Sequence, residues 1–117
     1  MFNVIIVGGE KTNNFSLFKE KCIFYLKDKA KSGEGITILS TGDKFVDLFA
    51  NKYGIIVQYF FPDWKTDGKM ALSVRNNKML NKANAMIAFD DGSKDMEILL
   101  FECKNKKIPL RIIKKEE

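Results

Sequence analysis

The chain has 117 residues, of which 45% are hydrophobic and 12% aromatic, and this is enough apolar material for the core of one domain. It contains no histidine, which excludes Ser–His and Cys–His nucleophile pairs and every histidine-containing metal site. Twenty basic residues against fifteen acidic ones give a formal net charge of +5, a modest excess that favours anionic ligands.

Five short apolar runs rich in β-branched residues predict five strands. They span residues 2–7, 35–39, 55–60, 85–89 and 110–113. Most of these runs are nearly continuously hydrophobic rather than alternating, which indicates strands buried on both faces of a parallel sheet.

Four stretches with helical spacing separate the runs, and Asn13 or Asn14, Gly54 and Pro109 supply the cap and stop signals expected at their ends. The apolar face of each predicted helix is, in chain order, Phe15, Phe18, Cys22 and Leu26; Phe45, Leu48 and Phe49; Leu72, Met79 and Leu80; and Met96, Leu99, Leu100 and Cys103.

The alternation of strands and helices predicts one α/β domain over residues 1–117, with residues 114–117 as a frayed tail. We expect a Rossmann-like three-layer fold with a five-stranded, mainly parallel sheet and about four flanking helices. The chain begins directly with an apolar strand and has no apolar run near the length of a membrane span, so we expect a soluble, cytoplasmic protein. Cys22 and Cys103 are expected to be buried, and neither a metal nor a cofactor is predicted.

Sheets of this type bind ligands at the carboxyl ends of their strands. Four loops are expected there, over residues 8–10, 40–43, 61–69 and 90–93, and each contains glycine. Taken singly, each loop is better explained as an ordinary turn followed by a helix cap. Their shared position at one edge of the sheet favours a binding pocket.

The first two loops offer backbone and hydroxyl groups to a ligand. Gly8 and Gly9 permit close approach to the backbone, although neither a GxGxxG nor a P-loop motif is present. Ser40 and Thr41, followed by Gly42, suit a phosphate or a ribose. The alternative is that Thr41 or Asp43 only caps the second helix.

The segment between residues 60 and 80 carries the strongest candidates for gripping an anion. Trp64 can stack on a base or close the edge of the core. Arg75 can hold a phosphate through two hydrogen bonds, with donor and acceptor groups of Asn76 beside it. The alternative for Arg75 is an exposed position on a solvated helix face.

The chain resembles the SLOG superfamily, most closely its YspA/YpsA-related branch of small bacterial and phage proteins. The matching features, in the family's order, are Gly8-Gly9 after the first strand, Gly42 after the second, PDWxxxG at 62–68, RNxxM at 75–79 and AFxDG at 88–92. Relatives include the LOG phosphoribohydrolases, the DNA-processing Smf proteins that hold single-stranded DNA, and sensor domains for NAD-derived signals. The resemblance implies a Rossmann-like fold and a nucleotide pocket with Arg75 and Asn76 facing the ligand.

The fourth loop departs from the family pattern. Relatives have a GT pair that cradles phosphate and, in the enzymes, a Glu soon after it, whereas this chain has Asp91-Gly92-Ser93. The resemblance places Ser93 in the position of the Thr hydroxyl and Glu97 near the expected acid, with Asp95 as the alternative. The missing GT pair affects hydrolysis more than binding.

Three functions follow as hypotheses. The first is binding, sensing or sequestration of a small nucleotide or NAD-derived ligand, and the resemblance implies a phage-associated protein. The second is LOG-type hydrolysis of nucleoside monophosphates, with Glu97 or Asp95 as the catalytic carboxylate. The third, less favoured, is single-stranded nucleic-acid binding through Trp64, Phe61 and scattered lysines. The resemblance also implies a homo-oligomer.

Overall fold

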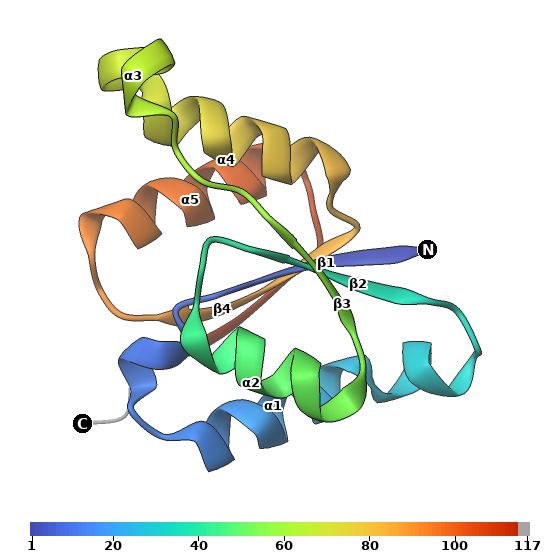
Figure 1. The fold of residues 1–117 in the computed structure, drawn as a ribbon. Coiled ribbons are helices and arrows are strands. Elements are labelled where there is room, and N and C mark those ends of the chain that lie inside the picture. The colour runs from blue at the N-terminus through green and yellow to red at the C-terminus, as the bar shows by residue number, and fades with distance from the viewer. Residues whose placement is uncertain (115–117) are drawn as a thin grey trace.

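Five parallel strands form one sheet in the order β3-β2-β1-β4-β5 in the computed structural model, which describes residues 1–114 (Figure 1). The strands are β1 (Phe2–Val7), β2 (Ile36–Ser40), β3 (Ile56–Tyr59), β4 (Ala85–Asp90) and β5 (Leu110–Lys114). Every neighbouring pair is parallel. The predicted Rossmann-like α/β fold is confirmed, and its sheet is parallel throughout.

Four main helices cover the two faces of the sheet, as Figure 1 shows. Helices α1 (Phe15–Lys31) and α2 (Lys44–Tyr53) lie on one face, and α4 (Ala71–Lys82) and α5 (Lys94–Asn105) lie on the other. The loops contain a short helix α3 (Trp64–Asp67) and two 3-10 turns, η1 (Gly9–Thr12) and η2 (Gly68–Met70). Asn14 caps α1, because its side-chain oxygen accepts a hydrogen bond of 3.0 Å from the Leu17 backbone N–H.

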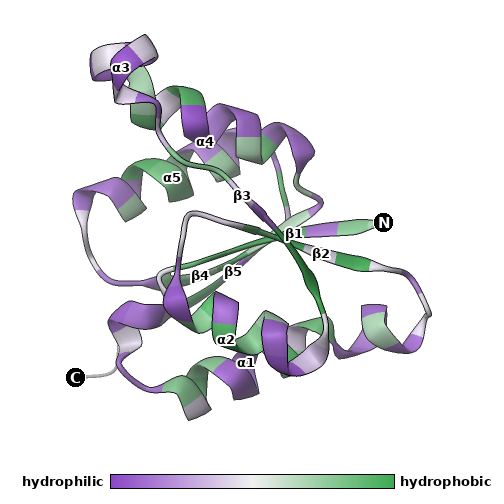
Figure 2. Ribbon diagram, viewed as in Figure 1, coloured by the Kyte–Doolittle hydropathy of each residue, from purple (hydrophilic) through white to green (hydrophobic). Residues whose placement is uncertain are grey.

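The sheet separates two apolar clusters, and its strands are accordingly the most hydrophobic part of the chain (Figure 2). Side chains alternate along β1, so Val4 and Ile6 pack toward α1 and α2 while Ile5 and Val7 pack toward α4 and α5. Leu48 was expected to be among the apolar residues facing the core, but it is exposed. Residues Val46, Phe49 and Ala50 form the buried face of α2 instead.

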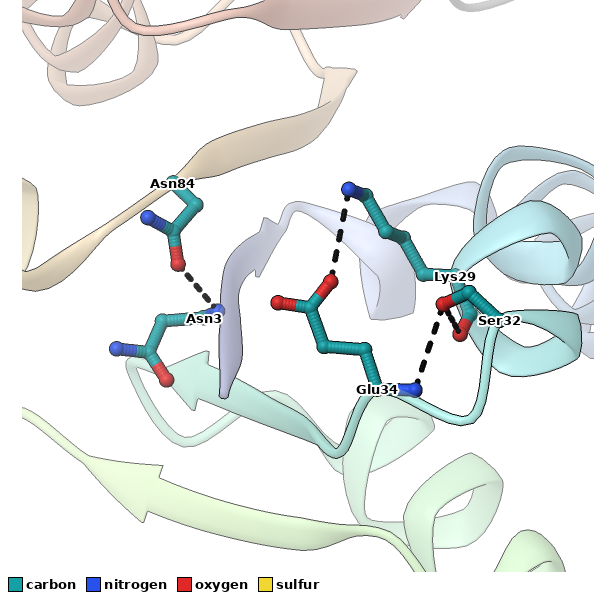
Figure 3. A network of polar contacts seen from close by, with 5 residues as sticks. All are labelled: Asn3, Lys29, Ser32, Glu34 and Asn84. Atoms are coloured by element: carbon teal, nitrogen blue, oxygen red, sulfur yellow. Dashed lines mark hydrogen bonds and ion pairs between the residues drawn. The ribbon is translucent and has the colours of Figure 1, made fainter.

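Polar contacts fix the amino-terminal edge of the sheet (Figure 3). The backbone N–H of Asn3 donates to the side-chain oxygen of Asn84 at 2.8 Å, and Lys29 forms an ion pair with Glu34 at 3.6 Å. At the other end of the chain, Lys114 is not part of a frayed tail but the last residue of β5, in register with Asp90. Residues 115–117 of the expected tail lie outside the described part.

Candidate functional site

A cleft of about 400 Å³ opens at the carboxyl ends of the strands, within the range of roughly 300–1,000 Å³ typical of small-molecule sites. The chain runs from β1 to β2 and β3 on one side, whereas β4 and β5 lie on the other side of β1. The strand order therefore reverses between β1 and β4, and ligands bind at such reversal points in open parallel sheets. The cleft is bounded by the end of β1, the segments that follow β1, β2 and β4, and helices α4 and α5.

The two glycines after β1 have different roles. Gly8 lines the cleft with a φ of +78°, and a Cβ there would lie only 2.1 Å from the Phe89 carbonyl oxygen. Gly9 is buried, and its Cβ would lie 2.2 Å from the ring of Phe18. Gly8 thus lets the first loop approach β4 closely, and Gly9 lets α1 pack beneath it.

Carboxylates of the protein already occupy the amino terminus of α2. Asp43 accepts hydrogen bonds from the backbone N–H groups of Phe45 (2.8 Å) and Glu10 (3.1 Å), and Glu10 in turn accepts one from Lys44 N–H (3.2 Å). Burial raises the pKa of Asp43 above its usual range, although the backbone N–H groups around it act in the opposite direction. The start of this helix is therefore a poor place for a second anion.

Side chains of the loop after β4 also accept hydrogen bonds from nearby backbone N–H groups. Asp90 accepts a hydrogen bond from Gly92 N–H, and Asp91 accepts one from Ser93 N–H, both at 2.9 Å. The Ser93 hydroxyl then caps α5 by accepting from Met96 N–H at 3.2 Å. Partial burial raises the pKa of Asp91, but the hydrogen bonds from Ser93 outweigh burial and hold that pKa below its usual range. The backbone N–H groups of Gly92, Ser93 and Met96 are thus satisfied internally.

Arg75 is the cation that the fold positions most firmly in the cleft. Its Nε donates to the side-chain oxygen of Asn76 at 2.8 Å, and the Asn76 amide donates to Glu102 at 3.0 Å. Asn76 is only 3% exposed, so its buried amide holds the side chains of Arg75 and Glu102 in place. Burial lowers the pKa of Arg75, while the charges of Asp95 and Glu102 raise it, and the guanidinium stays protonated.

The end of the guanidinium that faces away from Asn76 is available for a ligand. Within residues 1–114, the terminal nitrogens of Arg75 donate no hydrogen bond and no carboxylate oxygen lies within 4 Å of them. Two parallel N–H donors of this kind match the oxygens of a phosphate or a carboxylate.

Nine of the residues expected at the site line this one cleft. They are Gly8, Thr41, Gly42, Asp43, Arg75, Asn76, Asp91, Ser93 and Asp95.

The other five lie elsewhere. Gly9 is packed under the first loop, and Ser40 is buried with its hydroxyl accepting from Gly42 N–H at 3.0 Å. Trp64 is 55% exposed on α3 and neither lines the cleft nor closes the core. Gly92 and Glu97 border a neighbouring depression beside α5.

Sequence reasoning missed three polar residues of the cleft: Glu10, Lys11 and Ser73. Glu10 directly follows the glycine pair, a position that could have indicated it. With them, the cleft wall contains four carboxylates, Glu10, Asp43, Asp91 and Asp95, and two cations, Lys11 and Arg75. Its local charge balance is therefore acidic although the chain is basic.

Within the described residues, no group of three or more Cys, Asp or Glu side chains is placed to hold a metal ion. None of the helices between residues 1 and 114 has the length and apolar character needed to cross a membrane. The chain matches no protein-family model, and no curated protein matches it. The SLOG resemblance stays a prediction.

Proposed function

We propose that the cleft binds a small nucleotide or nucleotide-derived ligand, and that the chain is a SLOG-like binding module that senses or sequesters it. The observation that carries the proposal is Arg75, which lines a cleft at the reversal point of the sheet and is held at its Nε by Asn76. A guanidinium fixed in this way is suited to one phosphate or carboxylate group.

The carboxylates of the cleft favour a ligand that also carries hydrogen-bond donors. Asp91 and Asp95 line the cleft with Arg75, and ribose hydroxyls can donate to such oxygens without a charge penalty. Because the helix starts are capped internally, Arg75 and Lys11 are left to balance anionic charge. A ligand with one phosphate and a free ribose fits this balance better than a polyphosphate or a nucleic-acid backbone, which needs many cations.

The proposal is tested by calorimetric titration and thermal shift with AMP, ADP-ribose and ribose 5-phosphate. Ligand at a hundred times its Kd stabilises the fold by about 2.7 kcal/mol. Arg75→Ala should weaken binding by about 10- to 100-fold, the value of a charge-assisted contact. Arg111→Ala is the matched control, because Arg111 is the other arginine of the chain and is exposed on β5, outside the cleft. Absence of any shift at millimolar ligand, or equal losses in both variants, would refute the proposal.

Hydrolysis of the N-glycosidic bond is the second candidate, and one observation favours a specific form of it. Asp95 lies in the cleft with Arg75, whereas Glu97 does not, so Asp95 is the better placed carboxylate to stabilise an oxocarbenium-like state. Release of free adenine from AMP, lost in Asp95→Asn but kept in Glu97→Gln, would replace the binding-only proposal. Intact AMP after prolonged incubation supports binding alone.

A further inference from the structure

Strand β3 forms an open edge of the sheet. It pairs with β2, and no other strand in residues 1–114 lies on its outer side. Phe60 N–H donates to the Ser40 carbonyl at 2.8 Å, and backbone groups alternate in direction along a strand. The N–H and C=O groups of Val57 and Tyr59 therefore point away from the sheet, free to pair with another strand.

The edge at β3 lacks the charges and prolines that usually discourage such pairing, although the strand is only four residues long. Residues 55–61 contain no charge and no proline, and Ile56, Tyr59 and Phe61 are exposed. The opposite edge at β5 carries Arg111 and Lys114, which protect it from pairing. The two edges of one sheet are thus built differently.

Two side chains of the β3 edge are held by contacts within the protein. The Tyr59 hydroxyl donates to Asp47 of α2, and the Tyr59 and Phe61 rings stack 5.9 Å apart at an angle of 8°. Side chains that are fixed before binding lose little conformational freedom in an interface.

We propose that the β3 edge pairs with β3 of a second copy of this chain, antiparallel about a two-fold axis. Antiparallel pairing of one strand with its own copy is self-complementary and closes at two chains, because each copy has a single free β3 edge. The first charged residue before the strand is Lys52 and the first one after it is Asp63, so the two-fold axis brings these two oppositely charged side chains of the two copies toward each other. These opposite charges favour a second copy over an unrelated strand.

The exposed side chains limit the strength of the dimer. Pairing removes roughly 250 Å² of apolar surface per copy if Ile56, Tyr59 and Phe61 each lose about half the area of an aromatic side chain. This is well below the roughly 800 Å² per partner of a standard interface, even with the strand backbone added. The dimer is therefore expected to be weak, transient and concentration-dependent.

Sedimentation velocity from about 1 to 500 μM tests the proposal without any ligand, so its outcome is independent of the proposed function. The expected result is a rise from the 13.4 kDa monomer to a dimer, with slower hydrogen exchange of the Val57 and Tyr59 amides at high concentration. Ile56→Lys should raise the dissociation constant about tenfold or more, because an edge lysine opposes strand pairing. Phe101→Lys is the matched control, since Phe101 on α5 has the same 64% exposure as Ile56.

Circular dichroism establishes that both variants are folded, and Gln58→Lys, at an exposed position of the same strand, replaces Ile56→Lys if that variant is not. A chain that stays monomeric over the whole range would overturn the proposal. Equal weakening by Phe101→Lys, or a dimer that the edge lysines leave intact, would assign the contact to another surface and overturn it as well.

Discussion

Replacing Asn76 by alanine should be among the most costly polar substitutions in this chain. Asn76 is almost completely buried, and both ends of its amide are used, one accepting from Arg75 and the other donating to Glu102. Alanine removes both contacts together and leaves two charged groups, each partly buried, without their common partner.

The magnitude follows from these two hydrogen bonds. A hydrogen bond to a charged group contributes about 1.5–3 kcal/mol, and the partial exposure of Arg75 and Glu102 lets water replace some of it. We therefore expect Asn76→Ala to lower the free energy of unfolding by about 2–4 kcal/mol. That is a large share of the roughly 5–15 kcal/mol typical of such a domain.

Urea denaturation of Asn76→Ala and Asn77→Ala measures this effect directly. Asn77 is the next residue of α4 and is exposed, and its side chain makes no hydrogen bond within the described chain. Both variants gain the same helix propensity, about 0.6 kcal/mol, so their difference isolates the buried contacts. In the double variant Asn76→Ala/Glu102→Gln, the change in unfolding free energy should differ from the sum of the two single changes by about 0.5–3 kcal/mol. A difference below about 0.5 kcal/mol between Asn76→Ala and Asn77→Ala would refute the role assigned to Asn76.

Two further outcomes are expected. Gly8→Ala and Gly54→Ala both place a side chain at positive φ, which costs about 1–2 kcal/mol, but the added Cβ has open space only at Gly54. Denaturation should therefore show that Gly8→Ala costs about 1–3 kcal/mol more, from overpacking against β4, and equal costs would contradict the close approach. The pKa of Asp43 is raised in the folded state, so the folded protein binds this proton more readily than the unfolded chain does. Asp43 therefore adds stability as the pH falls through its folded pKa toward the unfolded value of about 3.9. The stability of the wild type relative to Asp43→Asn should accordingly increase between pH 7 and pH 4 in urea denaturation, and a constant difference would exclude the raised pKa.

The sheet could be predicted from the sequence because its strands are marked by the composition of each run alone. The predicted strand bounds lie within one or two residues of those observed, since turn residues bracket each apolar segment. The buried face of α2 was less certain, because Val46, Leu48 and Phe49 are all apolar within four positions. Only packing against α1 and the sheet decides that Leu48 faces outward.

The general place of the cleft was also predictable, since parallel strands bring their carboxyl ends to one edge. The hydrogen bonds that satisfy the backbone N–H groups at that edge were not predictable. Asp43 and Glu10 cap the same helix although they stand thirty-three positions apart, and no local pattern relates them. Trp64 was attractive as a stacking group by residue type, but Pro62 and Asp63 lead into α3, which lies at the start of α4 (Figure 1), and Trp64 does not line the cleft.

The contrast between the net charge of the chain and the charge of the cleft decides how the ligand should be sought. A net charge of +5 suggests an affinity for polyanions, yet four carboxylates and two cations line the cleft. Fields from exposed lysines are screened beyond about 8–10 Å, whereas groups lining a half-enclosed cleft act on a ligand at contact distance. We therefore expect the local balance to dominate recognition. In the proposed function, Arg75 sets the position of one anionic group, and the surrounding carboxylates favour hydroxyl or amine donors around it.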